Sequence, residues 1–169
     1  HKELGVNPDM AAFGKTISNG IPMAALIGKK EIMENAKKTF ISSTNWSERL
    51  GPATAVAFIK KHKREKAGKI LIDNGKKIRN IWERTSKNAG LDLQVSGIYP
   101  LSSFKIINDD WPIIITYFIQ EMLKHNILAS DRCYSNTCQN EKNLNIYEAA
   151  CNDVFLKISR YLKQNTLKS

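Results

Sequence analysis

One stretch decides how this chain folds: residues 12 to 25 read AFGKTISNGIPMAA. Lys15 follows an apolar run of strand length and precedes a turn rich in small residues. Small neighbours leave room for a planar group beside the amine, and a lysine in such surroundings can act as a nucleophile. By spacing alone, an ordinary lysine on a surface turn is the commoner explanation. A phosphate-binding loop of the GxxxxGK[ST] kind is excluded, because its upstream glycine is missing.

The residues around this stretch, 1 to 59, are dense in turn formers. They hold five of the nine glycines and three of the five prolines of the chain, which favours tight turns and close backbone approaches. Residues 10–13 and 23–27 are short apolar runs bounded by turn residues, and we expect each to be a strand. Residues 29–38 are expected to form a short helix.

From Pro52 onward the pattern becomes helical. A helix is expected to begin at Pro52, to pause near Gly68 and to continue as an amphipathic helix that stops at residues 88–90. The remaining expected elements are strands at 91–95, 103–107 and 127–129 and helices at 112–126 and 144–162. Residues 60 to 169 are therefore expected to form a small α+β layer, with helices packed on a short sheet.

The positive charge of the chain is concentrated in one segment. The net charge is +10, and residues 60 to 87 alone hold 11 lysines and arginines against three acidic residues. Such a helix face could bind nucleic acid or an acidic membrane surface. No aromatic stacking motif accompanies the charge, so we predict a solvated helix face, with no nucleic acid and no membrane as partner.

Composition narrows the class of protein further. The 169 residues are 42% hydrophobic, 8% aromatic and 25% charged, which excludes a disordered, collagen-like or coiled-coil chain. No run approaches the roughly 18 apolar residues of a membrane span. Three cysteines without a CxxC pair, and three scattered histidines, predict no metal site and reduced thiols in the cytoplasm. The opening His-Lys-Glu-Leu has no signal-peptide pattern and suggests a piece of a longer polypeptide.

Residues 7–22, NPDMAAFGKTISNGIP, resemble the cofactor-lysine motif of class III pyridoxal-phosphate-dependent aminotransferases, most closely the glutamate-1-semialdehyde 2,1-aminomutase-like branch. Residues 28–33 are similar to the segment that follows this motif in the family. Residues 40–44 and 51–55 resemble its hydroxyl-bearing loop and the Asn-Pro-Leu-Ala segment after it. Residues 117–129 resemble part of its C-terminal small domain. The resemblance covers nearly the whole chain, and its first third carries the specific motif.

This resemblance implies an α/β chain of the type I fold of pyridoxal-phosphate-dependent transferases. Residues 1–59 would be the C-terminal end of the large cofactor-binding domain, and residues 60–169 the small C-terminal α+β domain. Lys15 would be the catalytic residue, which forms a Schiff base with pyridoxal 5′-phosphate and moves a proton. Ser43 or Thr44 would bind the cofactor phosphate, in this family often across the interface of a homodimer.

The resemblance also shows departures from the family pattern. Ser18 and Asn19 stand where glycines are usual, and the loop at residues 45–50 is longer than usual. The family's aspartate that binds the pyridine nitrogen would lie upstream of His1, so the isolated chain should form an incomplete, inactive site.

The implied activity is the transfer of an amino group between small-molecule donors and acceptors, and the sequence leaves transamination and 1,2-amino migration both open. Two other functions also stay open: a small basic nucleic-acid-binding module and a non-catalytic remnant that keeps the dimer contacts.

Overall fold

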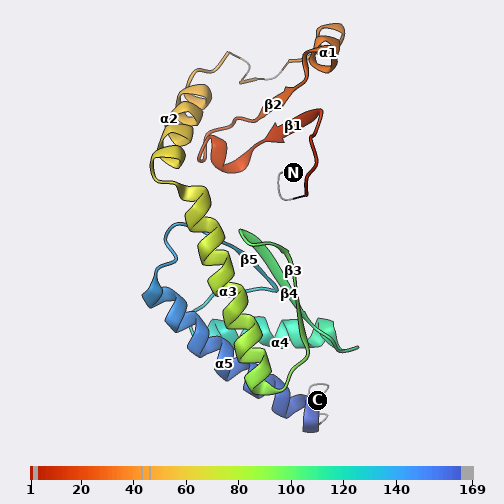
Figure 1. The fold of residues 1–169 in the computed structure, drawn as a ribbon, viewed down its shortest axis with the longest axis vertical. Coiled ribbons are helices and arrows are strands. Elements are labelled where there is room, and N and C mark those ends of the chain that lie inside the picture. Colours follow the sequence, from red (N-terminus) through yellow and green to blue (C-terminus); the bar gives the residue numbers. More distant parts are fainter. Residues whose placement is uncertain (2–3, 43, 46, 165–169) are drawn as a thin grey trace. The chain divides into compact units, whose positions relative to one another are not determined.

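The computed structural model describes residues 1, 4–42, 44–45 and 47–164. Its contacts divide the chain into two compact units, residues 1–66 and 67–169 (Figure 1). The domain boundary expected between residues 59 and 60 lies within helix α2 (Leu50–Arg64), and the division into a large-domain end and a small domain stays a prediction. That helix is amphipathic and continuous through the basic residues Lys60 to Arg64, so the change in composition does not mark the break in the backbone.

The first unit is built on an antiparallel ribbon of two strands. Strand β1 (Met10–Phe13) pairs with β2 (Ala25–Gly28), in a register that runs from Met10 opposite Gly28 to Phe13 opposite Ala25. A 3-10 turn, η1 (Lys15–Ile17), lies between the strands. The expected strand 10–13 is confirmed, and the expected strand 23–27 is shifted to 25–28 because Met23 and Ala24 belong to the connecting turn.

Three short or helical elements complete the first unit. The expected helix at 29–38 divides into α1 (Lys30–Met33) and a 3-10 helix, η2 (Glu34–Lys38). Helix α2 (Leu50–Arg64) begins two residues before Pro52, where a Glu48 carboxylate oxygen accepts a hydrogen bond from the Leu50 N–H at 2.9 Å. The helix ends at Arg64 rather than near Gly68, because Lys66 has a left-handed φ of 51°.

Little of the first unit is buried. Among its described residues only Ser18, Gly51 and Ala55 are buried, and no residue of β1 or β2 is. Apolar side chains of the ribbon, such as Phe13 and Leu26, are exposed. A two-stranded ribbon of this kind is marginally stable by itself in water.

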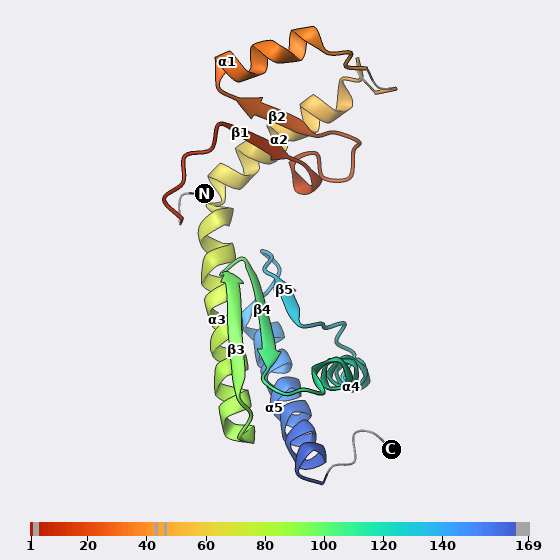
Figure 2. The same ribbon diagram turned by 90° about the vertical axis from the view of Figure 1, so that its right-hand side faces the viewer.

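The second unit is an antiparallel sheet packed with three helices (Figure 2). The strands lie in the order β3-β4-β5, and α3 packs along α5, which also packs against α4. Their bounds are α3 (Ala67–Ala89), β3 (Leu93–Ile98), β4 (Leu101–Ile106), α4 (Trp111–Lys124), β5 (Arg132–Tyr134) and α5 (Glu141–Gln164). The expected α+β layer is confirmed.

Aromatic rings fill the core of this unit. The Phe104 ring of β4 lies with its centroid 4.9 Å from that of Trp82 and 5.2 Å from that of Phe118. Phe155 of α5 stacks on Phe118 at 5.5 Å. Offset and edge-to-face pairs of this kind stabilise a core beyond the area that they bury. The core therefore ties all three helices to the central strand.

The expected strand at 127–129 is wrong. Asn126 has a φ of 59°, the Ile127 N–H donates to the Met122 carbonyl at 3.0 Å, and the Asn126 N–H donates to the Leu123 carbonyl at 2.9 Å. These two hydrogen bonds form the C-terminal cap of α4. The Ile127 N–H is therefore bonded to the helix and is not available to pair with a neighbouring strand. The third strand of the sheet is instead β5, residues 132–134.

None of the helices in the described part of the chain is long and apolar enough to cross a bilayer.

Candidate functional site around Lys15

Lys15 lies at the junction between strand β1 and the turn that leads to β2. Gly14 separates it from the strand, and Lys15 is the first residue of η1. Its φ is 55°, in the left-handed region that side chains other than glycine rarely occupy. Backbone conformations of this kind cost free energy, and they cluster at functional sites where the surroundings impose them. The left-handed conformation of Lys15 therefore indicates a functional site, and the sequence alone does not reveal this conformation.

The turn after Lys15 contains two more left-handed residues. Asn19 has a φ of 49° and Gly20 a φ of 98°. The hydroxyl of the buried Ser18 donates to the Ile21 carbonyl at 2.5 Å, and the Met23 carbonyl lies 3.4 Å from the same oxygen. The chain thereby folds back tightly between η1 and β2.

This turn surrounds an open depression. Its cavity volume is about 480 Å³, and it is lined by Lys15, Thr16, Ser18, Asn19, Gly20, Ile21, Pro22 and Met23. A β-carbon added at Gly20, which lines the depression, would meet nothing within 4 Å, so the depression is open at that residue. The depression is within the size range of small-molecule sites.

A second depression lies next to the first and shares Pro22 and Met23 with it. It is closed on the other side by Asn45, Glu48 and the first residues of α2. A β-carbon at Gly51 would lie 3.0 Å from the Met23 β-carbon, so the glycine admits this close approach of helix and turn. The first turn of α2 and the turn after Lys15 thus form one continuous surface.

The lysines near the ribbon differ in their partners. Lys29 makes an ion pair with Asp9, its Nζ 2.5 Å from Oδ1, and its backbone N–H donates to the Asp9 carbonyl at 3.0 Å. Within the described part of the chain, the Lys15 amine makes no ion pair or hydrogen bond. Lys15 therefore combines an amine that has no partner among the described residues with a place in the lining of a depression.

Of the two expected phosphate-binding residues, the structure describes only Thr44. Ser43 lies outside the described residues. Thr44 lies in a turn, is exposed, and is not among the residues that line either depression. Its neighbour Asn45 does line the second depression. Within its own chain, Thr44 therefore does not line the depression at Lys15.

The cationic face of α3 is largely held within its own unit. Lys77 pairs with Glu141, and Arg84 pairs with Glu148 of α5. The Arg79 guanidinium lies 4.5 Å from the centroid of the Tyr99 ring and donates to the Ser102 hydroxyl at 2.7 Å. These contacts favour a structural role for the charges, and the prediction that they bind no nucleic acid stays a prediction.

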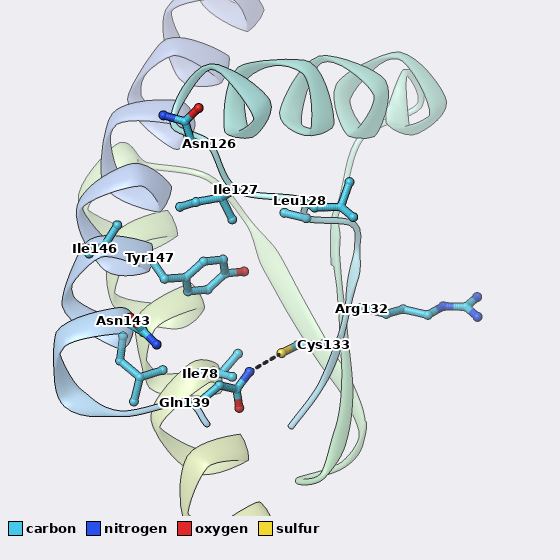
Figure 3. Close-up of a pocket in the computed structure, with 12 residues that line it drawn as sticks. Ile78, Asn126, Ile127, Leu128, Arg132, Cys133, Gln139, Asn143, Ile146 and Tyr147 are labelled. Atoms are coloured by element: carbon cyan, nitrogen blue, oxygen red, sulfur yellow. Dashed lines mark hydrogen bonds between the residues drawn. The ribbon is translucent and has the colours of Figure 1, made fainter. Parts of the chain in front are cut away.

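A pocket of the second unit was not foreseen from the sequence. It has a volume of about 420 Å³ and lies between α5, β5 and residues 126–129 (Figure 3). Cys133 accepts a hydrogen bond from the Gln139 amide at 3.6 Å, and the Tyr147 hydroxyl oxygen accepts one from Trp82 Nε1 at 2.7 Å. Burial raises the pKa of the Cys133 thiol, so this group stays protonated. The periodic stripe of α5 predicted a buried helix face and gave no sign of a cavity.

The remaining thiols are not arranged for metal binding in the described structure. Cys133, Cys138 and Cys151 are free, and burial raises the pKa of Cys151 to about 12. No group of three or more potential metal ligands occurs among the described residues.

Comparison with curated proteins finds aminotransferases as relatives. The chain is 28% identical over 143 residues to 3-aminobutyryl-CoA aminotransferase of Cloacimonas acidaminovorans, which is 81% of this chain and 34% of the relative. It is 29% identical over 94 residues to aminopentol aminotransferase of Sphingopyxis macrogoltabida, 56% of this chain and 22% of that protein. It is also 29% identical over 113 residues to glutamate-1-semialdehyde 2,1-aminomutase of Methanococcoides burtonii, 65% of this chain and 26% of that protein. The chain spans about a third or less of these relatives, and no family model matches it.

Solved structures identify the fold. The FumI protein of Sphingopyxis sp. MTA144, in its PLP internal aldimine form, superimposes with a TM-score of 0.85 at 21% identity, over 96% of this chain and 40% of that one. The ornithine aminotransferase of Toxoplasma gondii gives 0.79 at 20% identity, over 94% of this chain and 39% of that one. The chain has the type I fold of pyridoxal-phosphate-dependent transaminases and corresponds to a C-terminal portion of them. The predicted fold class is confirmed.

Proposed function

We propose that the protein containing this chain is a class III aminotransferase that uses pyridoxal 5′-phosphate, and that Lys15 is its catalytic lysine. The proposal rests on the conformation and the surroundings of Lys15. Its amine is unpaired among the described residues, its backbone is held left-handed, and it faces a cavity. It does so in a fold shared with transaminases, and its sequence relatives are aminotransferases and an aminomutase.

The residues present fit the cofactor chemically. The cofactor carries an aldehyde, which reacts with a primary amine, and a flat ring, which needs open space beside that amine. Lys15 supplies the amine, and Gly20 leaves the depression beside it open. Lys29, the other lysine at the ribbon, is paired with Asp9 and fits less well.

When bound, the cofactor would supply an electron-withdrawing ring that stabilises negative charge on the carbon bearing the amino group. Lys15 Nζ would attach the cofactor to the protein. Once released, the same Nζ would accept the proton from that substrate carbon and return it later in the reaction. A lysine serves this purpose well, because its long flexible side chain can move between the two positions.

The cofactor phosphate would be held by the hydroxyls of Ser43 and Thr44. We propose that they act on the cofactor of a second copy of the chain, in a homodimer. Two observations support this arrangement: Thr44 does not line the depression at Lys15 of its own chain, and the apolar residues of the ribbon are exposed. Closed two-fold dimers are also the commonest oligomers.

The rest of the site would come from outside the described residues. No acidic residue of the described chain lines the depression at Lys15, so the partner of the pyridine nitrogen would be supplied by another part of the polypeptide. In this proposal residues 1–59 complete the large cofactor-binding domain, and residues 60–169 form the small domain. The uncovered ribbon is what the end of a larger sheet would present.

The reaction we propose is transfer of an amino group between two small molecules. Two of the three relatives named above are aminotransferases, and the aminomutase supports 1,2-amino migration as the alternative. Both reactions would use Lys15 in the same way. We place the protein in the cytoplasm, since the three cysteines are free thiols, as is usual in a reducing compartment.

The test is to replace Lys15 with alanine in the full-length protein. We expect the visible absorption of the lysine-bound cofactor and the turnover of amino donors to disappear, with the fold retained, because the side chain is exposed and its role is chemical. Lys30→Ala is the matched control, because Lys30 is exposed at the start of α1 and does not line the depression. A Lys15→Ala enzyme that turns over at the wild-type rate would refute the proposal.

A further inference from the structure

Ser18 is the one buried polar side chain among the described residues of the first unit, with 2% of its surface exposed. It lies three residues after Lys15, in a part of the chain where almost every other residue is exposed. Burial of a hydroxyl lowers the stability of a protein unless the hydroxyl is hydrogen-bonded. The hydrogen bonds of Ser18 therefore indicate what its side chain does in the structure.

The bonds of Ser18 join the two ends of the turn. Its N–H donates to the Lys15 carbonyl at 3.4 Å, and its own carbonyl accepts from the Ile21 N–H at 3.2 Å. Its hydroxyl donates to the Ile21 carbonyl at 2.5 Å, with the Met23 carbonyl 3.4 Å from the oxygen. One residue thus contacts Lys15 on one side and the approach to β2 on the other.

The conformation held by these bonds is one that the chain would otherwise leave. Lys15 and Asn19 both have positive φ values, 55° and 49°, which are unfavourable for residues with a β-carbon. Without a restraint, Lys15 would relax to negative φ, and its amine would be directed elsewhere. Because few residues of the first unit are buried, we expect the contacts that hold Lys15 in this conformation to lie among its neighbours in the sequence.

We propose that Ser18 is a positioning residue for Lys15: its hydroxyl locks residues 18–23 and so holds the lysine amine at the depression. The proposal rests on the function proposed above for Lys15. Ser18 does not act on the substrate itself.

The first test uses the full-length protein without cofactor. Replacement of Ser18 by alanine removes the hydroxyl and leaves the Ile21 carbonyl without this donor. We expect hydrogen exchange of the backbone amides at positions 18 and 21 to accelerate by about tenfold, the factor that one intramolecular hydrogen bond is worth. Amides of the β1–β2 ladder, such as that of Ile27, should exchange at the wild-type rate.

The second test separates positioning from binding. In the loaded enzyme we expect Ser18→Ala to lower kcat by about tenfold and to leave KM for the amino donor within about twofold, since the hydroxyl orients the amine and binds no substrate. Ser18→Thr, which retains a hydroxyl, should restore most of kcat. Thr39→Ala is the matched control: it removes an exposed hydroxyl that donates to the Ala36 carbonyl at 2.9 Å, and both exchange and kcat should stay unchanged.

The outcomes distinguish this inference from the proposed function. If wild-type protein carries the cofactor on a lysine other than Lys15, the proposed function fails. If Lys15 carries it but Ser18→Ala changes neither exchange of residues 18–23 nor kcat, the positioning role is refuted. If Ser18→Ala does not fold, Ser18→Cys replaces it, because cysteine is similar in size to serine and is a weaker hydrogen-bond donor. A kcat that is lower in Ser18→Cys than in Ser18→Thr then supports the positioning role. Equal kcat values of these two variants refute it.

Discussion

Lys15 combines an exposed amine with a backbone conformation that its own β-carbon disfavours. A residue under this strain lowers the stability of the protein, and it is retained where the position of its side chain matters. The backbone strain at Lys15 can be measured separately from its chemistry. Glycine and alanine both remove the amine, but only glycine adopts a positive φ at little cost.

We expect the cofactor-free full-length protein with Lys15→Gly to be more stable than the one with Lys15→Ala by about 1 kcal/mol, because glycine adopts positive φ at little cost. Urea unfolding of the two variants measures the difference. At Lys60, an exposed residue inside helix α2, the order should reverse, since glycine is unfavourable within a helix. Equal stabilities of the two Lys15 variants would show that the left-handed conformation is not present in solution.

At the scale of single residues, the sequence indicates which lysine matters but not how it is held. The glycines around Lys15 are visible in the sequence, and the resemblance of the motif singles the lysine out. Its positive φ lies in a turn that the hydrogen bonds of Ser18 hold, and such local turn contacts leave no periodic pattern in the sequence. That Thr44 does not line the depression likewise leaves no pattern in the sequence.

At the scale of elements, periodicity predicted the helices well and one strand poorly. Leu144, Cys151 and Phe155 recur at helical spacing and lie on the buried face of α5. Residues 127–129 mimic a strand because Ile127 and Ala129 are half-buried while Leu128, at 90% exposure, faces solvent. The competing signal was Asn126, which adopts the left-handed conformation that ends α4.

Helices α4 and α5 are joined by a cluster of charges. The Glu121 carboxylate, with 6% of its side chain exposed, accepts from Lys124 and from Lys157 at 3.0 Å. Asp153 accepts from Lys157 at 2.8 Å and lies 2.9 Å from His125. The hydrogen bond from Lys124 lowers the pKa of Glu121, and the one from Lys157 lowers the pKa of Asp153. Both carboxylates are thus more acidic in the folded state than in the unfolded one.

The cluster predicts a pH dependence of stability. Because the folded pKa values are lowered, the stabilisation is complete above the ordinary carboxylate pKa values and is lost as pH falls through the folded ones. We expect the free energy of unfolding of this chain to fall below about pH 4.5, and Glu121→Gln to reduce that slope. Urea unfolding from pH 7 to pH 3 is the measurement. Glu83→Gln, at an exposed site on α3, should keep the wild-type slope, and an unchanged slope in Glu121→Gln would contradict the assignment.

At the scale of the whole molecule, the two units differ in how complete they are. The second unit has an aromatic core that includes Trp82, Phe104 and Phe155, and its α+β class follows from the sequence pattern. The first unit buries almost nothing in its described residues. Its ribbon was predictable from two apolar runs, but the pattern within a run does not indicate which residues pack on it.

The proposed exchange of hydroxyls across a homodimer predicts complementation between inactive variants. A Lys15→Ala protein lacks the amine, and a Ser43→Ala, Thr44→Ala double variant lacks the phosphate hydroxyls. In a hybrid dimer one site would receive both defects and the other none, so refolding an equal mixture should restore about a quarter of wild-type activity. Light scattering checks the dimer itself. A full-length protein that is monomeric at micromolar concentration, or a mixture that regains no activity, would contradict the arrangement.

The claim on which the account depends is that the cofactor is attached to Lys15. Borohydride reduction of the loaded full-length protein makes the attachment permanent, and peptide mapping then identifies the modified lysine. The account predicts a phosphopyridoxyl group on Lys15 and on no other lysine, because its amine is unpaired among the described residues and faces the cavity, whereas Lys29 is paired with Asp9. A label on Lys29 or Lys30, with Lys15 unmodified, would contradict it.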